Sequence, residues 1–236
     1  MRFILVVAAA LLLANLSCNQ SRPPVKPGPN AANHQEKHAK SGKDGKASFV
    51  SLFDGKSLDR WQGDVAHYKI EDGTLVCHGE KIFTKKQYSN FVLRFDFRLP
   101  PGANNGVGIR TPMQGDPAYA GMEIQILDDG HPKYKEMKPP LQPYQAHGSI
   151  YGVVPAKRGF LKPTGQWNSE EIVADGSHIK VTLNGTVITD ADLSKVKKTM
   201  DGHEHPGLHN AKGYLGLLGH GADPVAFRNI EIKELP

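Results

Sequence analysis

The sequence predicts an all-β fold, a jelly-roll sandwich of two antiparallel sheets. Apolar and polar residues alternate in many short stretches, and turn dipeptides such as Asp72-Gly73 and Asn184-Gly185 separate several of them. Long stretches with the period of a helix are scarce. Many short strands over roughly 190 residues, with long loops between some of them, are typical of one two-sheet domain. A closed barrel is the alternative architecture.

The first 18 residues are predicted to be an export signal. Arg2 precedes an apolar run from Phe3 to Ala14 that is too short to span a bilayer. A small residue precedes Cys18, as in the lipobox of bacterial lipoproteins, although Asn15 stands where Leu is usual. Two alternatives follow, a lipid anchor through Cys18 or secretion after cleavage at another site. Both predict an exported protein of the periplasm or cell envelope.

Residues 19–48 are predicted to form a flexible basic tether. They contain four prolines and several lysines but almost nothing large and apolar, so burial cannot offset the entropy of ordering them. Residues 1–48 hold seven of the 29 basic residues and two of the 24 acidic ones, which accounts for the whole net charge of +5. The domain of residues 49–236 is therefore neutral, and no nucleic-acid partner is expected. The tether could lie against an anionic membrane.

The domain is predicted to begin with Ser51–Leu58 and Trp61, and the strand from Phe91 to Leu99 alternates most clearly. A Pro-rich segment, 130–143, is expected to run over the surface. The apolar parity changes between Phe227 and Ile230, which predicts a bulge. The other predicted strands are 68–70, 74–76, 106–110, 121–128, 171–173, 179–183, 186–188, 213–217 and 225–232.

Two cysteines are present, Cys18 and Cys77, so no disulfide framework is expected. Cys77 lies in the apolar stretch 73–78, where a small buried hydrophobic residue is the expectation rather than a nucleophile.

Two neighbouring strands are predicted to carry the functional face. Read with period two, Val107 and Ile109 point to the same side as Met122, Ile124 and Ile126. Arg110, Glu123 and Gln125 point to the other side together with glycines, which let a ligand approach the backbone closely. We therefore expect the floor of a binding groove. The alternative is a solvated face on which Arg110 and Glu123 form a cross-strand ion pair.

Six motifs resemble the 3-keto-disaccharide hydrolase domain family, and the resemblance covers residues 49–236. It implies a concanavalin-like, laminarinase-like sandwich whose concave sheet holds a sugar, and hydrolytic or lyase action on glycosides oxidised at carbon 3. A seventh stretch departs from the family pattern, because Leu217-Leu-Gly-His-Gly221 stands where Leu-Gln-Asp-His-Gly is usual. The six motifs are Ser51–Leu58, Asn90–Arg98, Asn104–Arg110, Gly121–Asp128, Lys162–Asn168 and Phe227–Ile230.

The residues themselves disfavour an ordinary two-carboxylate mechanism. Laminarinase-like enzymes carry Glu-x-Asp-x-x-Glu on one strand, and here the same positions hold Glu123, Gln125 and Asp128. Gln125 cannot act as an acid, and Asp128 reaches the face of Glu123 only if the strand bulges. Ordinary glycoside hydrolysis needs a pair of carboxyl groups.

A ketone at carbon 3 makes the reaction easier, because it acidifies the hydrogen on carbon 2 and allows elimination with one general base. The candidate bases are Glu123 and His220, and the candidate electrostatic stabilisers are Arg110 and Lys162. Gln125, Tyr151 and Asp128 are the further candidates for binding the sugar. Each has a structural alternative: a solvated loop for His220, ordinary loop surface for Lys162 and a core aromatic for Tyr151.

The stretch from His203 to His209 contains three histidines and a glutamate, which could hold a divalent metal ion. It matches no structural zinc spacing, so a solvated loop is the favoured interpretation and no cofactor is assigned.

Three function classes remain. The first is an enzyme acting on a carbohydrate partner, a 3-keto disaccharide or glycoside. The second is a non-catalytic carbohydrate-binding module of the same fold, favoured by the two polar residues missing before His220. The third, a conventional glucanase, is disfavoured by Gln125.

Overall fold

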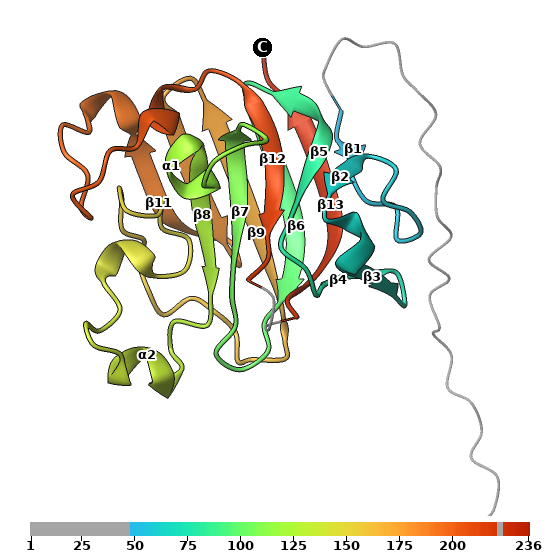
Figure 1. Ribbon diagram of the computed structural model, residues 1–236, viewed down its shortest axis with the longest axis horizontal. Coiled ribbons are helices and arrows are strands. Elements are labelled where there is room, and N and C mark those ends of the chain that lie inside the picture. Colours follow the sequence, from blue (N-terminus) through green and yellow to red (C-terminus); the bar gives the residue numbers. More distant parts are fainter. Residues whose placement is uncertain (1–47, 221–223) are drawn as a thin grey trace, which may run out of the picture. The chain divides into compact units, whose positions relative to one another are not determined.

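Two antiparallel sheets build the domain and confirm the predicted all-β sandwich (Figure 1). The structure is a computed structural model that describes residues 48–220 and 224–236, and all of these lie in the unit Gly45–Pro236. The predicted export signal, Cys18 and residues 19–47 of the predicted tether lie outside the described residues. None of the described helices is long and apolar enough to cross a membrane.

The large sheet has the strand order β11-β10-β9-β6-β13-β4-β3, with β1 also paired to β13. The small sheet has the order β2-β5-β12-β7-β8. Since each sheet ends in edge strands, the closed barrel is excluded. The large sheet consists of β1 (Val50–Ser51), β3 (Tyr68–Glu71), β4 (Thr74–Cys77), β6 (Phe91–Arg98), β9 (Trp167–Asp175), β10 (His178–Leu183), β11 (Thr186–Asp192) and β13 (Ala226–Glu234).

The small sheet consists of β2 (Trp61–Gly63), β5 (Lys81–Tyr88), β7 (Asn104–Thr111), β8 (Met122–Leu127) and β12 (Gly213–Leu218). The sequence pattern did not predict β5, because Ile82, Phe83 and Thr84 are consecutive buried residues rather than alternating ones. The helices are short and lie in the connections: α1 (Pro117–Ala120), α2 (Pro132–Glu136) and the 3-10 turns η1 (Val65–His67), η2 (Pro143–Gln145), η3 (Leu193–Lys195) and η4 (Pro206–His209).

The core lies between the two sheets, and β6 shows how the sequence builds it. Phe91, Leu93, Phe95 and Phe97 are at most 3% exposed and belong to the core cluster. Burial of side chains of this size contributes about 1.5–3 kcal/mol each. The intervening residues face outward, where Arg94 pairs with Glu171 and Asp96 with Arg228. The alternation in the sequence therefore fixes which face of the strand is buried.

The predicted bulge near the end of the chain is confirmed. The register between β13 and β6 shifts between Arg228 and Glu231, and Asn229 has a φ of 52°. The shift accounts for the change of apolar parity, because both Phe227 and Ile230 are buried in the core.

One polar pair interrupts the core. His147 and Glu170 are 3% and 1% exposed, and their side chains meet at 3.0 Å between His147 Nε2 and Glu170 Oε2. The Leu127 backbone N–H donates to His147 Nδ1 at 3.3 Å, and the imidazole stacks on Phe97 with ring centroids 5.1 Å apart. Because Nδ1 accepts this bond, Nε2 carries the hydrogen that it donates to Glu170.

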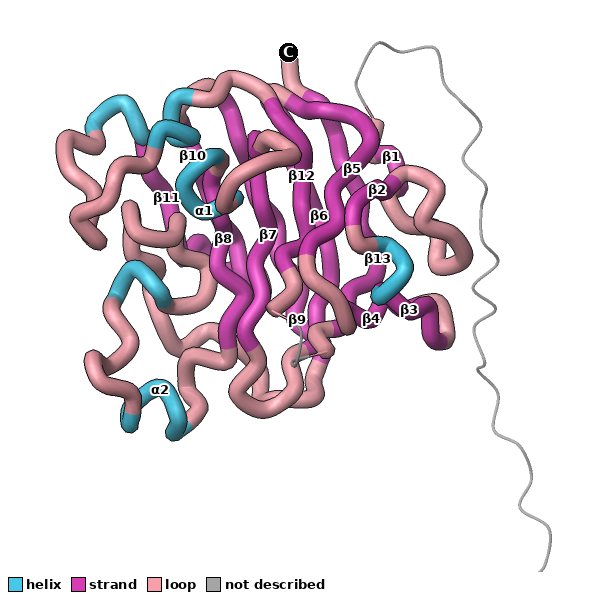
Figure 2. Tube along the Cα trace, viewed as in Figure 1, coloured by secondary structure: helices cyan, strands magenta, loops and turns pink. Residues whose placement is uncertain are grey.

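A loop segment, Gly148–Val154, follows the outer edge of β8 (Figure 2). The Gln125 N–H donates to Ser149 O at 3.0 Å, and the Tyr151 N–H donates to Glu123 O at 2.9 Å. The segment thus satisfies an edge that would otherwise present unpaired backbone groups. It also fixes the loop to the strand that carries Glu123.

Candidate functional site

The candidate site lies on the outer face of the small sheet, the side turned away from the core. Strand register brings Phe83, Gly216, Gly108 and Glu123 into one row across four strands. Lys81 pairs with Leu218, and Gly106 pairs with Gln125, on the same face. The glycines of β7 leave the space above the strand to their neighbours. A Cβ atom on Gly106 would lie 2.0 Å from Glu123 Oε1, so the carboxyl group lies directly over this backbone.

Glu123 is a buried carboxyl group with a perturbed proton affinity. The residue is only 7% exposed to solvent. Burial raises its pKa to about 8, the negative charge of Asp116 raises it further, and Lys81 acts in the opposite direction. At neutral pH the carboxyl group is therefore mostly protonated. A group with a pKa near the working pH can both take and give a proton.

Gln125 presents a free hydrogen-bond acceptor beside Glu123. It is 4% exposed, and its Nε2 donates to Asn104 Oδ1 at 3.1 Å. Its Oε1 is buried and has no hydrogen-bond partner within the described residues. Buried polar atoms are rarely left unpaired, so this oxygen is suited to accept a bond from a sugar hydroxyl.

Tyr151 lies at the margin of the same face. Its backbone bond to Glu123 holds it beside the carboxyl group, and Gln145 Nε2 donates to its hydroxyl at 3.3 Å. The ring is half-buried and meets Tyr144 edge to face, with centroids 6.1 Å apart. The structure therefore brings together Glu123, Gln125 and Tyr151.

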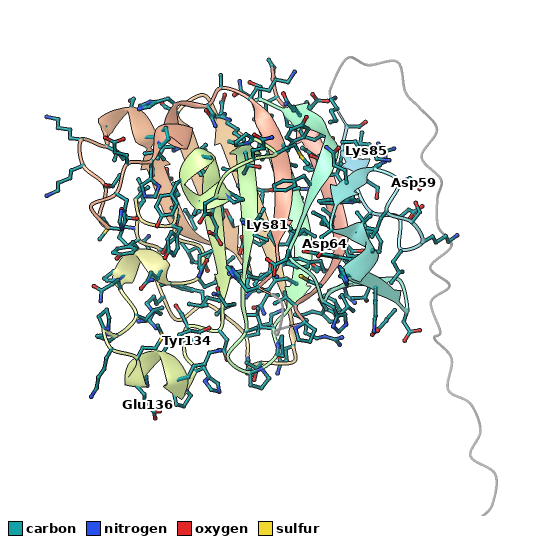
Figure 3. The ribbon with its side chains drawn as sticks, in the orientation of Figure 1. Asp59, Asp64, Lys81, Lys85, Tyr134 and Glu136 are labelled. Atoms are coloured by element: carbon teal, nitrogen blue, oxygen red, sulfur yellow. The ribbon has the colours of Figure 1, made fainter. Side chains whose placement is uncertain are left out.

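Lys81, labelled in Figure 3, is a site residue that sequence analysis missed. It is the first residue of β5, its side chain is half-buried, and its charge acts on Glu123. Recognition of β5 as a strand would have placed it on the outer face by its alternation with buried Ile82. It supplies a cation opposite the carboxyl group.

Arg110 does not lie where period-two alternation predicts, and this corrects the expectation that it faces Glu123. Its φ of 50° shifts the strand by one residue, so the methyl group of Thr111 lies over Gly108 instead. The Arg110 guanidinium donates to the backbone oxygens of Ser89 at 2.9 Å and Gly176 at 2.7 Å, and to Asn90 Oδ1 at 3.2 Å. Burial lowers its pKa below the usual value. These contacts fasten the turns at one end of the sandwich.

Arg110→Met is expected to lower the free energy of unfolding by about 2–4 kcal/mol, because it removes a buried cation that satisfies several acceptors. The matched control is Arg94→Met, which removes an exposed ion pair with Glu171 and is expected to cost less than about 1 kcal/mol. Urea unfolding measures both. Equal losses in the two variants would contradict the anchoring role of Arg110.

Asp128 and Lys162 come together, but away from Glu123. Asp128 Oδ2 accepts from the Gly102 N–H at 2.8 Å, and Lys162 Nζ donates to Trp167 O at 2.9 Å. Both line a hollow beyond the end of β8 whose described lining includes neither Glu123 nor Gln125. The strand does not bulge in a way that would return Asp128 to the face of Glu123.

His220 is exposed and follows the end of β12. Among the described residues, no group of three or more His, Cys, Asp or Glu side chains is arranged to hold a metal ion. In the predicted metal stretch, His205 is 5% exposed and is engaged by Asp201 Oδ2 at 2.9 Å and Ala118 O at 3.1 Å.

Comparison with known families identifies the chain. A family model described as the 3-keto-alpha-glucoside-1,2-lyase-like domain matches residues 48–233. The chain belongs to this family. A similar relative is the 3-keto-disaccharide hydrolase of Bacteroides thetaiotaomicron, 28% identical over 232 residues, which cover 79% of this chain and 78% of the relative.

Two crystal structures from Parabacteroides distasonis, both of proteins assigned as glycosyl hydrolases, have the same fold as this member of the 3-keto-alpha-glucoside-1,2-lyase-like family. The first is 35% identical with a TM-score of 0.70, over 80% of this chain and 100% of the other. The second is 26% identical with a TM-score of 0.65, over 80% and 94% of the two chains.

In this 3-keto-alpha-glucoside-1,2-lyase-like domain, packing explains the departure from the motif Leu-Gln-Asp-His-Gly. Leu218 is 2% exposed, and its Cδ2 lies 3.0 Å from the place of a Cβ on Gly216 and 3.4 Å from that on Gly108. An apolar side chain thus fills the outer face next to the Glu123 carboxyl group, which favours its neutral form.

Gly219 is confined more tightly. A Cβ there would lie 2.0 Å from Gly79 O, 2.5 Å from Glu80 O and 2.6 Å from Cys77 Sγ. The segment 77–80 therefore occupies the space that a side chain at position 219 would need.

Proposed function

We propose that this enzyme cleaves the glycosidic bond of glycosides that carry a ketone at carbon 3, with Glu123 as its single acid–base group. The family and its relatives identify the chain as a glycoside-cleaving enzyme. The oxidised substrate and the assignment of residues are the proposal.

The observation that supports it is that, among the described residues, Glu123 is the one buried carboxyl group on the outer face of the small sheet, where an ordinary glycosidase needs two. Gln125 holds the position of a second acid, and Asp128 is bound to the Gly102 N–H. Asp116 is exposed and accepts from the Ala118 N–H at 3.1 Å as the N-cap of α1. A pair about 5–5.5 or 6.5–9.5 Å apart across the scissile bond defines the ordinary mechanism. A ketone-assisted elimination needs only one base.

In the proposed reaction, the ionised Glu123 takes the proton from carbon 2, and the electrons of that bond pass to the ketone oxygen as an enolate. Lys81 stabilises the negative charge. The enolate collapses, a double bond forms between carbons 1 and 2, and the glycosidic oxygen leaves carbon 1 with the bonding electrons. It takes a proton from water. Addition of water across the new double bond then gives net hydrolysis, while Gln125 Oε1 and the Tyr151 hydroxyl bind sugar hydroxyls.

The rate is expected to depend on pH in a direction that identifies Glu123 as the base. Because the active form is ionised and the pKa is about 8, kcat/KM should rise about tenfold per pH unit below pH 8 and level off above it. A pH–rate profile with a 3-keto disaccharide measures this. A rate that falls through pH 8 would assign Glu123 as the acid instead.

Product analysis tests the function itself. The full chain is incubated with a 3-keto disaccharide and with its unoxidised parent. We expect cleavage of the keto sugar alone. Cleavage of the parent would favour a conventional glucanase, and saturable binding without cleavage of either would favour a carbohydrate-binding module.

We further propose that the protein is exported to the periplasm or cell envelope and held there by a lipid on Cys18, on the grounds of residues 1–18 alone. Mass analysis of the mature N-terminus is expected to find a lipidated Cys18. A free N-terminus beyond that residue would contradict the anchor.

A further inference from the structure

Three tyrosines gather on the connections that flank β8, the strand that carries Glu123. Tyr119 belongs to α1, Tyr144 to η2 and Tyr151 to the segment along the strand edge, and all three are half-buried. The rings of Tyr144 and Tyr151 meet at 86°. Burial and then the Tyr151 hydroxyl raise the pKa of both Tyr119 and Tyr144, so the three phenol groups are close enough to influence one another. We call them the tyrosine cluster.

The tyrosine cluster is fixed to the strand that carries the acid–base group. Tyr151 bonds to the Glu123 backbone, and α1 ends immediately before β8, so Tyr119 stands four residues before Glu123. In Figure 1, α1 lies over the β7 and β8 end of the small sheet. The aromatic rings therefore border the site on the side of β8.

Hydrogen bonds from the segment 200–205 hold the tyrosine cluster in place. The His205 ring lies between Ala118 O and Asp201 Oδ2, and its centroid is 4.7 Å from that of Tyr119. The backbone N–H groups of Met200 and Asp201 donate to Gly152 O at 2.7 and 3.2 Å, next to Tyr151. Aromatic surfaces that are already held in place lose little entropy when a ligand binds.

Lys81 and the tyrosine cluster lie on opposite sides of Glu123. The strand order β5-β12-β7-β8 puts Lys81 three strands away from Glu123 on one side, and the cluster borders the other. In the proposed reaction, carbon 2 faces Glu123 and the ketone oxygen on carbon 3 faces the Lys81 cation. Carbon 1, the other neighbour of carbon 2, then points toward the tyrosines together with its leaving group.

We propose that Tyr119, Tyr144 and Tyr151 form the subsite for the leaving group, and that this subsite selects a pyranose by stacking against its C–H face. This inference rests on the proposed function for its orientation. The amphipathic rings suit such a ligand, because each offers an apolar face and a hydroxyl for the sugar's own hydroxyl groups.

The test compares two substrates, the 3-keto derivative of a glucose disaccharide and methyl 3-keto-glucoside, which lacks the second ring. Tyr119→Ala and Tyr144→Ala are expected to lower kcat/KM for the disaccharide about 10- to 100-fold and to change the methyl glycoside less than about threefold. The corresponding Phe variants should keep most of the rate. Phe160→Ala, an exposed aromatic in another loop, is the matched control and should change neither. Equal losses on both substrates, or no loss, would overturn the subsite.

A binding measurement separates this inference from the reaction. Glucose, the leaving sugar itself, is titrated against the full chain. Its binding should be weakened at least tenfold by Tyr119→Ala and Tyr144→Ala and retained in Glu123→Gln. If glucose does not bind to the unaltered protein, or binds equally well to the tyrosine variants, the subsite is overturned even if the keto disaccharide is cleaved. Tyrosine-dependent glucose binding without cleavage would reject the reaction and leave the subsite standing.

Discussion

Glu123→Gln is expected to lower kcat for a 3-keto disaccharide by about 10²- to 10⁴-fold, because the amide cannot take the proton from carbon 2. The substitution keeps the size of the side chain and its position over Gly106, so KM should change little. Steady-state kinetics at pH 8 measures the loss. Glu71→Gln, an exposed carboxylate of β3, is the matched control and should retain full turnover. Full turnover by Glu123→Gln would remove Glu123 from the mechanism.

At high pH the same variant is expected to be more stable than the unaltered protein. The folded-state pKa of Glu123 is about 8 and its ordinary value is 4.5, so the folded state binds a proton that the unfolded chain releases between these values. The contribution of this group is fully present below pH 4.5 and is lost as the pH rises through 8, a change of about 3–5 kcal/mol. Gln has no such loss.

Urea unfolding at pH 4 and pH 9 measures this effect without any substrate. Glu123→Gln and the unaltered protein should be nearly equal at pH 4, and the variant should be the more stable at pH 9. The same difference at both values would show that the carboxyl group titrates normally. The ionised form of Glu123 is therefore the one that the reaction needs and also the one that destabilises the fold.

His147→Ala is expected to lower the free energy of unfolding by about 3–5 kcal/mol. It leaves Glu170, whose side chain is fully buried between the sheets, without its donor, and it removes a ring that packs on Phe97. It also frees the Leu127 N–H, which donates to His147 Nδ1. Chemical denaturation followed by tryptophan fluorescence measures the loss.

The matched control is His178→Ala, which removes an imidazole–carboxylate pair with Asp190 on the surface, where both side chains are about half exposed. Its expected cost is below about 1 kcal/mol. If both variants lose the same stability, the buried pair contributes no more to the fold than a pair on the surface.

The sequence was informative wherever one face of a strand is buried and the other is not. The alternation of β6 and the pairing of β7 with β8 were predicted from period two, and the same parity placed Glu123 and Gln125 together. Arg110 was misplaced because its positive φ depends on contacts with Ser89 and Gly176, which are remote in sequence. Lys81 was missed because β5 buries consecutive residues.

The tyrosine cluster shows another way in which sequence is insufficient. Tyr119 lies in the short helix α1 and Tyr144 in the 3-10 turn η2, where the sequence has no periodic pattern, and only the path of these connections around β8 brings both together with Tyr151. Asp128 illustrates the reverse, since its spacing matches a glycosidase motif while its carboxylate caps a turn at Gly102. Spacing along a strand predicts the face of a side chain but not the loops that surround it.

The crowding around Gly219 limits which residues can replace it by a single substitution. Because Gly79 O, Glu80 O and Cys77 Sγ fill the space of a side chain there, the Asp that is usual at this position cannot be restored by a single substitution. The connection between β4 and β5 would have to change first. Positions 77–80 and 219 are therefore epistatic, and we expect homologues to vary them together, with a bulkier residue at 219 only where the 77–80 turn follows a different path.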